Sequence, residues 1–285
     1  MSLLSLHFAE VMARLEERAA AGLAPGAVFE GVDDDLFVLI AGKAYDGYPA
    51  LKALLPDFPD DALVGALTGN RSLDDAMKEA SLFWRLVKAQ YDEHGRGRLS
   101  AAKVVDYGAG WGRITRLCAK DVGELIAVEP NPVFQEVFRK TRAPGALICS
   151  DYMSEAPLGI EGADLLFSFS ILTHTSEALA RNVRDRWAEA LAPGGVAVFT
   201  IRPGTFLDGS RGEIRQLSAD ELAAGRAAYA KGQAAFWAYP DTPDFGIAVL
   251  PMDYLHDLFG PDFEIRGPRY LLENPTQLPI VMVRR

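Results

Sequence analysis

The sequence predicts an α/β protein with a mostly parallel sheet, preceded by a helical segment. From residue 103 onward, short β-branched and apolar runs alternate with helical stretches, which is typical of βαβ units. A glycine-rich turn follows the first of these runs. Residues 1 to about 92 instead carry apolar residues at helical spacing. We therefore expect a domain boundary in the connector 93–100, which combines glycines with charged residues.

The N-terminal part is expected to be mainly helical, because its apolar residues recur every three or four positions. Ser72 is a suitable N-cap for its last helix, with Asp74 and Asp75 in the first turn. The expected helices cover residues 3–20, about 33–55 and 72–92.

The C-terminal part is expected to supply seven strands with helices between them. Residues 203–246 interrupt this pattern with a Gly-rich and then Ala-rich stretch, which predicts a helical insertion that acts as a lid. The expected strands are 103–107, 125–129, 146–149, 164–169, 196–201, 262–270 and 279–284, and the expected helices are 112–121, 131–140, 176–191 and 251–259.

Composition narrows the partners and the compartment. The formal net charge of -10, without any basic run, disfavours nucleic acid. The sequence contains no stretch of about 18 apolar residues, so we expect no membrane span, and the N-terminal helix lacks the pattern of a signal peptide. Cys118 and Cys149 lie in apolar stretches, so we expect two reduced core thiols and a cytoplasmic protein.

The motif VVDYGAGWGR at 104–113 carries the strongest functional signal. A strand that turns at once into a helix needs positive φ or close backbone approach, which favours Gly108, Gly110 and Gly112. The expected result is a concave loop of backbone amides. A tight structural turn would use the same residues, so the neighbouring strand ends matter.

Two further strands end in residues that suit a nucleoside. Glu129 follows the glycine loop by about 20 residues, where a carboxylate accepts hydrogen bonds from both ribose hydroxyls. Asp151 can accept from an adenine amino group, and Tyr152 can stack on the ring. A solvated strand-end carboxylate is the plain alternative for Glu129.

The glycine spacing separates two cofactors. A dinucleotide requires GxGxxG with an open helix N-terminus for the pyrophosphate, but the spacing here is GxGxG, with Arg113 in the third glycine register. Asp106 at the strand end would repel a pyrophosphate and attract an ammonium. S-adenosylmethionine (AdoMet) has an ammonium and a sulfonium and no phosphate.

These motifs, with the strand-four run DLLFSFSILTHTSE and the later LAPGGVAVFTI, resemble the class I AdoMet-dependent methyltransferases over residues 101–201. The resemblance implies a Rossmann-like, mostly parallel seven-stranded sheet with a reversed C-terminal strand. The expected organisation is then an N-terminal helical segment at 1–100, followed by a methyltransferase domain at 101–285 that contains the lid at 203–246.

The resemblance also implies residue roles. The glycine loop would cradle the methionine portion of AdoMet, Glu129 would bind the ribose with Asn131 beside it, and residues 168–170 would pass close to the sulfonium. The product would be S-adenosylhomocysteine (AdoHcy). The expected cofactor-binding residues are Asp106, Gly108, Ala109, Gly110, Trp111, Gly112, Glu129, Pro130, Asn131, Asp151, Tyr152, Ser168, Phe169 and Ser170.

Methyl transfer is an in-line displacement that rests largely on alignment of acceptor, methyl and sulfur. A hydroxyl acceptor also needs a base, and His174 is the best candidate; a His that only shapes the pocket is the equal alternative. The motifs for methylation of nucleic acid bases are missing, and no carboxylate cluster follows strand four. We expect a metal-independent reaction on oxygen or, second, nitrogen.

The acceptor pocket is expected to use aromatics of the N-terminal helices and of the insertion, with Trp84, Trp237 and Tyr239 as candidates. The GWGR loop and the terminal NPTQ segment are similar to bacterial methyltransferases that modify sugars or secondary metabolites. A sugar-like or small polyol hydroxyl is thus the expected acceptor. The alternatives are a non-catalytic module that binds AdoMet or AdoHcy, and an NAD-dependent oxidoreductase; the sequence does not predict the oligomeric state.

Overall fold

The strands form a seven-stranded sheet and a separate two-stranded sheet in the computed structural model, which describes residues 8–41, 47–68, 72–151, 153–154, 156–208, 216–271 and 274–285. The large sheet has the order β3-β2-β1-β4-β5-β9-β8. Its strands are β1 (Lys103–Tyr107), β2 (Glu124–Glu129), β3 (Ala146–Cys149), β4 (Ala163–Ser168), β5 (Leu191–Ile201), β8 (Phe263–Pro268) and β9 (Leu278–Arg284).

The sheet is mostly parallel. The pairs β1–β2, β2–β3 and β4–β5 are parallel, whereas β9 runs antiparallel to both β5 and β8. The predicted mostly parallel seven-stranded sheet with a reversed C-terminal strand is therefore confirmed. The chain forms two compact units, residues 1–89 with 97–149 and residues 90–96 with 150–285, which are described in turn.

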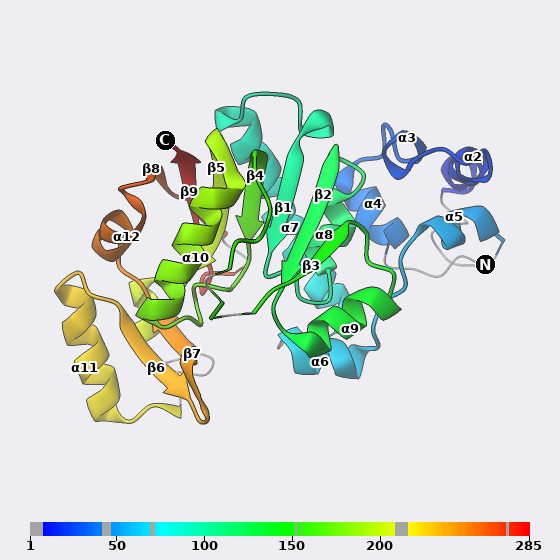
Figure 1. The fold of residues 1–285 in the computed structure, drawn as a ribbon. Helices are drawn as coiled ribbons and strands as arrows, with labels where there is room; N and C mark the ends of the chain where they lie inside the picture. The colour runs from blue at the N-terminus through cyan, green and yellow to red at the C-terminus, as the bar shows by residue number, and fades with distance from the viewer. Residues whose placement is uncertain are drawn as a thin grey trace. The chain divides into compact units, whose positions relative to one another are not determined.

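The first unit contains β1, β2 and β3 and most of the helices before residue 150 (Figure 1). Ser72 caps α7 as predicted, because its Oγ accepts a hydrogen bond from Asp75 N at 3.2 Å. The short helices α3 and α6 were not predicted. The helices are α2 (Ala9–Ala20), α3 (Pro25–Val28), α4 (Asp34–Ala41), α5 (Pro49–Leu54), α6 (Asp61–Thr68), α7 (Leu73–His94), η1 (Leu99–Ala101), α8 (Arg113–Cys118) and α9 (Pro132–Lys140).

The core of the first unit explains the continuous apolar runs of its strands. Val104 and Val105 of β1 and Val128 of β2 have no exposed surface, which is expected for a parallel sheet covered on both faces. Phe138 of α9 packs against Ala127 of β2. Helix α9 carries Asn131 as its N-cap, whose Oδ1 accepts from Val133 N at 2.9 Å.

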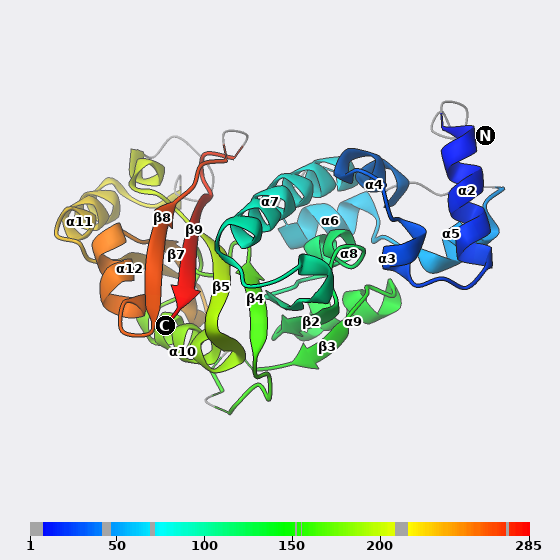
Figure 2. The same ribbon diagram turned by 90° about the horizontal axis from the view of Figure 1, so that it is seen from above.

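The second unit contains β4, β5, β8 and β9, which lie side by side in Figure 2. A chain of aromatic contacts joins two of its helices to the sheet: Trp187 to Phe199 and Phe259, and Phe259 to Phe263. Strand β5 begins at Leu191, five residues before the expected start. The helices are α10 (Glu177–Ala190), η2 (Gly204–Asp208), α11 (Ala219–Ala230) and α12 (Met252–Phe259).

The insertion is only partly helical, which corrects the prediction of a helical lid. Helix α11 is followed by an antiparallel hairpin of β6 (Ala235–Tyr239) and β7 (Thr242–Val249), seen with α11 beside it in Figure 1. Asp241 supplies the positive φ of the tight turn at +63°. Ala235, Ile247 and Val249 of the hairpin form a small core with Phe206 and Leu207 of η2 (Gly204–Asp208).

The two cysteines differ from each other. Cys118 is buried as predicted, and burial raises the pKa of its thiol well above the usual value. Cys149 is exposed, which corrects the expectation of a second core thiol: it ends β3, the edge strand of the sheet, where one side lacks a neighbouring strand. None of the described helices combines the length and apolarity that crossing a membrane requires.

Candidate active site

The glycine loop after β1 has the backbone conformation that the sequence predicts. Gly108, Gly110 and Gly112 have φ angles of +79°, +59° and +84°, a region that residues with a Cβ rarely adopt. The loop is tied to the next strand, because Gly108 N and Ala109 N both donate to Val128 O, at 2.8 and 3.0 Å. Gly112 is also the N-cap of α8.

Two of these glycines face different surroundings. A Cβ on Gly110 would meet no atom within 4 Å, so the space in front of this residue is open. A Cβ on Gly112 would lie 2.8 Å from both Ala143 Cβ and Phe138 Cε2. Gly110 therefore borders a vacant space, whereas Gly112 allows close packing of the loop against α9.

Glu129 holds the loop together with the start of α9. Its Oε2 accepts from Gly110 N and its Oε1 accepts from Asn131 N, both at 2.7 Å. The carboxyl is only 3% exposed, and burial raises its pKa to about 7 even though these two N–H groups lower it. A carboxylate has about four lone pairs, so each oxygen can accept a second hydrogen bond.

Asp106, a second buried acid of this unit, lies near the end of β1 and is 2% exposed. Burial raises its pKa to about 7; the hydrogen bond from Thr115 Oγ1, at 2.6 Å, lowers it and the charge of Glu129 raises it. Burial thus leaves two acids of the glycine-loop region with pKa values near neutrality. Such shifts are common at functional sites.

Trp111 has its side chain in the interior. It is 1% exposed, and its ring lies against the guanidinium of Arg116 at 4.9 Å and edge-on to Phe58 at 6.3 Å. Arg116 donates to Trp111 O at 2.5 Å and to Asp57 O at 3.0 Å. The indole anchors the loop to the N-terminal helical part, so any cofactor contact of Trp111 must come from its backbone.

The second unit contains the other predicted cofactor residues. Asp151 is exposed, and its Oδ1 accepts from Met153 N at 2.8 Å; Tyr152 lies outside the described residues. Ser168 ends β4, is 1% exposed, and its Oγ has no hydrogen-bond partner within the part of the chain that the structure describes. Phe169 is 8% exposed.

Ser170 is held in a strained conformation by a small polar network. Its φ is +63°, a left-handed value that is uncommon outside glycine and recurs at functional sites. Its backbone N donates to Thr200 Oγ1 at 2.8 Å, and its Oγ lies 2.9 Å from Thr173 Oγ1 and accepts from Gln277 Nε2 at 3.0 Å. The network brings the NPTQ segment to the loop after β4, a contact that the sequence did not predict.

His174 has a defined orientation. Its Nδ1 lies 2.8 Å from Gly246 O, and since a carbonyl only accepts, Nδ1 carries the proton and the lone pair is on Nε2. Its ring stacks on Phe245 at 5.8 Å with an interplanar angle of 5°. Nε2 accepts from Arg202 Nη2 at 3.4 Å, and Tyr239 OH lies 3.2 Å from Nδ1.

Comparison with known proteins identifies the domain. Residues 104–195 match the family model described as a methyltransferase domain. Residues 104–195 form a methyltransferase domain. The match includes the glycine loop, Glu129 and His174, and confirms the prediction of an AdoMet-dependent methyltransferase. No curated protein matches the sequence.

Solved structures share the fold of this methyltransferase. An S-adenosylmethionine-dependent methyltransferase from Clostridium acetobutylicum is 9% identical, with a TM-score of 0.51 over 78% of this chain and 97% of that one. A protein of Listeria monocytogenes assigned to the same class is 14% identical, with a TM-score of 0.50 over 73% of this chain and 98% of that one. At these identities the likeness concerns the fold.

The predicted acceptor residues have unequal surroundings in the methyltransferase. Trp84 is 2% exposed and its Nε1 donates to Asp121 Oδ2 at 2.9 Å, so it packs within the first unit. Trp237 is half-buried against α11, where it lies over Gly225. Tyr239 is half-buried and contacts His174. Among the three, Tyr239 is the one that the structure joins to another predicted site residue.

The two loop glycines give the methyltransferase a matched pair of variants. Gly110→Ala places its methyl in open space, so we expect weaker AdoMet binding, by roughly tenfold, with a strain of about 1–2 kcal/mol from the left-handed φ. Gly112→Ala adds overpacking against Phe138 to the same strain, so its free energy of unfolding should fall by roughly 2–4 kcal/mol. Calorimetry and chemical denaturation measure both; equal effects of the two variants would contradict the open space at Gly110.

The raised pKa values of Glu129 and Asp106 predict two opposite pH dependences. AdoMet is a cation, so its affinity should increase as the pair ionises, by up to about tenfold per pH unit below pH 7 for one linked proton. The folded state binds these protons more tightly than the unfolded chain does. The pair's contribution to stability is therefore complete below about pH 4 and is lost as the pH rises through about 7.

Titration of AdoMet between pH 5.5 and about 7.3 tests the first dependence, since the cofactor's own α-amino group loses its proton near pH 7.7–8.0. Thermal unfolding of the free protein over the same range tests the second. Because the two acids repel each other, we expect them to titrate as a pair. An AdoMet affinity that does not change over this range would contradict the cation-attracting role of the pair.

Proposed function

We propose that the methyltransferase transfers the methyl group of AdoMet to a hydroxyl of a small, sugar-like molecule or secondary metabolite, without a metal ion. The observation that carries the cofactor half of the proposal is the position of Glu129. Its two oxygens already fix Gly110 N and Asn131 N, and their remaining lone pairs suit the two vicinal hydroxyls of a ribose. Asp151 and Tyr152 keep their proposed role at the adenine, as do residues 168–170 at the sulfonium.

The chemical step needs few residues. The acceptor oxygen attacks the methyl carbon, the S–CH₃ bond breaks with its electron pair going to sulfur, and the proton of the hydroxyl goes to Nε2 of His174. The hydrogen bond from Nδ1 to Gly246 O supports this role, because it leaves the lone pair on Nε2. Arg202 Nη2, which donates to this lone pair at 3.4 Å, must give way to the acceptor hydroxyl. AdoMet, when bound, would supply the methyl group and would be left as the neutral thioether AdoHcy.

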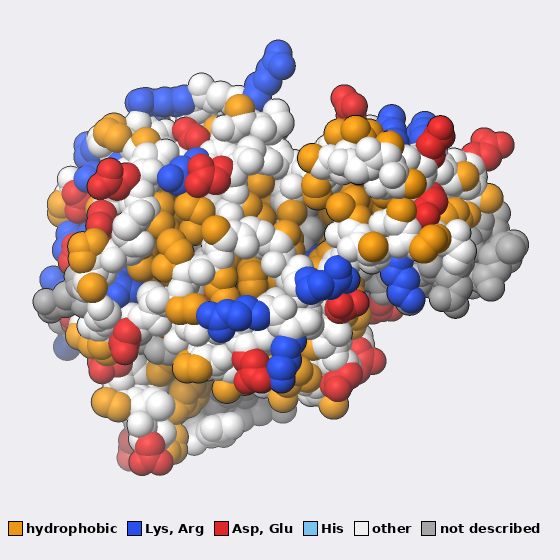
Figure 3. Space-filling model, turned by 45° about the vertical axis from the view of Figure 1, so that its right-hand side comes forward, with side chains coloured by type: hydrophobic (Ala, Val, Ile, Leu, Met, Phe, Trp, Pro, Cys, Tyr) orange, Lys and Arg blue, Asp and Glu red, His pale blue; other side chains and the backbone are white. Residues whose placement is uncertain are grey.

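The proposed partner is a small molecule, with residues 1–100 and the insertion 203–246 contributing to its pocket. The net charge of -10 supports a partner other than nucleic acid. On the face shown in Figure 3, Lys and Arg side chains have Asp and Glu side chains among them. A cytoplasmic location stays a prediction from the composition.

The proposal is tested with methyl-labelled AdoMet and a panel of sugars, polyols, phenols and amines, in buffer with and without EDTA. We expect label on a hydroxyl compound, unchanged by EDTA. Label on amines alone would replace the oxygen acceptor by nitrogen, and loss of turnover in EDTA would contradict metal independence. AdoMet binding without turnover on any acceptor would favour the non-catalytic module, whereas NADH binding without AdoMet binding would favour an oxidoreductase.

Among the described residues, no group of three or more His, Cys, Asp or Glu side chains is arranged to hold a metal ion. The EDTA comparison is therefore the direct test of the metal-independent reaction. It needs no assumption about the acceptor once any turnover is found.

A further inference from the structure

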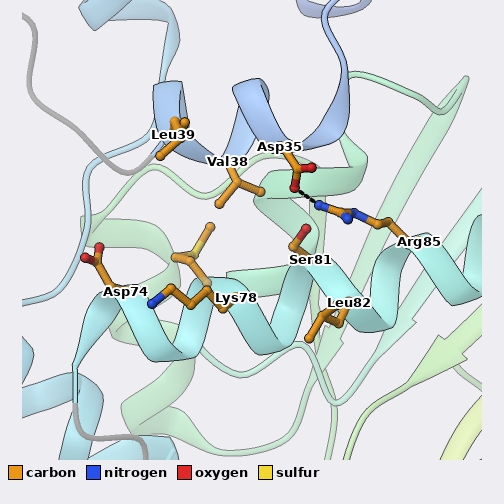
Figure 4. A pocket seen from close by; sticks show the side chains of 9 residues that line it. Asp35, Val38, Leu39, Asp74, Lys78, Ser81, Leu82 and Arg85 are labelled. Carbon is orange, nitrogen blue, oxygen red and sulfur yellow. Dashed lines mark hydrogen bonds and ion pairs between the residues drawn. The ribbon is translucent and has the colours of Figure 1, made fainter. Parts of the chain in front are cut away.

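A groove lies between α4 and α7 in the first unit (Figure 4). Its volume is about 460 Å³, which is within the range of small-molecule sites in proteins. Helix α4 contributes Asp35, Val38 and Leu39, and α7 contributes residues spaced one turn apart between 74 and 85. The glycine loop and Glu129 do not line it.

The walls of the groove are largely apolar. Val38 and Leu39 come from α4, and Met77 and Leu82 come from α7. Leu39 is 46% exposed, although large apolar side chains are usually covered. Met77 adds a flexible thioether side chain that adapts to ligand shape. The walls therefore favour a ligand with an apolar body.

One polar atom in the groove lacks a partner within the described chain. Ser81 is 5% exposed, and its buried Oγ makes no hydrogen bond. Figure 4 shows its hydroxyl directed from α7 toward α4. A buried hydroxyl without a partner is destabilising, and a ligand with one hydroxyl or carbonyl group would satisfy it.

The rim carries charges of both signs. Asp35 and Arg85 form an ion pair at one side, and Asp74 and Lys78 lie at the other. Two acids and two bases give the rim no net charge, so a ligand with a net charge gains no overall attraction and must displace an existing partner. This balance favours a neutral ligand over an anion or a cation.

We propose that the α4–α7 groove is a binding site for a neutral amphipathic small molecule, with its apolar body on Val38, Leu39 and Met77 and its hydroxyl or carbonyl group at Ser81. The site is separate from the cofactor residues. The proposal does not depend on the proposed methyl transfer.

The test uses three probes with one alkyl chain: 1-octanol, octanoate and octylammonium. Titration of the full chain, followed by chemical-shift changes of the Leu39 and Met77 methyl groups, should show saturable sub-millimolar binding of 1-octanol. The two charged probes should bind at least about fivefold more weakly. Absence of saturable octanol binding, or equal affinity for the three probes, would overturn the proposal.

Three variants locate the site. Leu39→Trp fills the groove and should abolish octanol binding, and Ser81→Ala should weaken it by about tenfold while raising the melting temperature slightly, because the unpartnered hydroxyl is gone. Ser100→Ala, an exposed serine of the same unit, is the control. Unchanged octanol binding in Leu39→Trp and Ser81→Ala would overturn the proposal. AdoMet titration of each variant shows that it is folded and keeps this result distinct from a failure of the methyltransferase assay.

Discussion

Replacing His174 with Ala is expected to lower kcat for methyl transfer to a hydroxyl about 10²- to 10⁴-fold, the usual contribution of a general base. The Kd for AdoMet should change by less than about threefold, because the proposed role of His174 concerns the acceptor proton. The physical reason is the tautomer: Gly246 O fixes the proton on Nδ1, so Nε2 can accept a proton.

The alternative is that His174 only attaches the hairpin. The segment around it pairs with β7, because Gly246 N donates to His174 O at 2.8 Å and Ala248 N donates to Thr173 O at 2.9 Å. These backbone bonds survive the substitution, so the His174→Ala variant should still fold. If His174 is purely structural, the variant has a lower melting temperature and a pH–rate profile of unchanged shape. If His174 is the base, the variant loses the acidic limb of the profile.

Two controls accompany this variant. His256→Ala removes an exposed histidine of α12 and should leave kcat unchanged. Tyr239→Phe removes the hydroxyl that lies 3.2 Å from Nδ1 and tests whether the orientation of the ring depends on it. A His174→Ala variant with kcat within about threefold of the parent would contradict the role as a base.

The parallel strands and the glycine loop were predictable because local sequence and tertiary structure favour the same conformation there. In β1, buried Val104 and Val105 are followed directly by glycines that need positive φ, so pattern and turn chemistry agree. Glu129 was predictable for a similar reason. It ends a buried strand at the required distance from the loop, and the structure adds which atoms it holds.

The hairpin β6–β7 was not predicted because the Ala-rich helix before it extends the helical pattern into AAFWAY. Its signals were a short aromatic run and the Pro-Asp turn at 240–241, which are weaker than the periodicity of α11. The contact between Tyr239 and His174 joins residues 65 positions apart, and no local pattern encodes such a separation.

The tryptophans show a further limit of the sequence. Trp84 was a candidate acceptor residue and Trp111 lies in the glycine loop, yet the indole of Trp84 donates to Asp121 and that of Trp111 lies against Arg116. Whether an indole faces a ligand or the core depends on packing partners distant in sequence. For Trp84 the hydrogen-bond partner is Asp121, which lies 37 positions further along the chain and is not revealed by the sequence around α7.

Replacing Glu129 with Ala should raise the Kd for AdoMet by at least about 100-fold. A hydrogen bond to a charged group contributes about 1.5–3 kcal/mol, and the variant loses two of them to the ribose. It also loses the acceptor that fixes Gly110 N and Asn131 N. Glu129→Gln should show a large part of this effect. Its amide oxygen can accept from one of the two backbone N–H groups, but its NH₂ cannot accept from the other.

The matched control is Glu124→Gln, at the exposed opposite end of the same strand, where the carboxylate lies 3.7 Å from Lys103 Nζ. Its AdoMet affinity should equal that of the parent. Calorimetry gives the Kd values, and thermal unfolding shows that each variant is folded. A Glu129→Ala protein that binds AdoMet within a few-fold of the parent would contradict the ribose role.

AdoHcy separates the two tasks assigned to the acids. It has the same ribose as AdoMet but lacks the sulfonium charge, so Glu129→Ala should weaken both ligands by a similar factor through the lost ribose hydrogen bonds. The pH dependence between 5.5 and 7 arises from attraction of a net positive ligand, so it should be steeper for AdoMet than for AdoHcy. If Glu129 acted only as a negative charge, the variant would instead weaken AdoMet alone and leave AdoHcy unchanged.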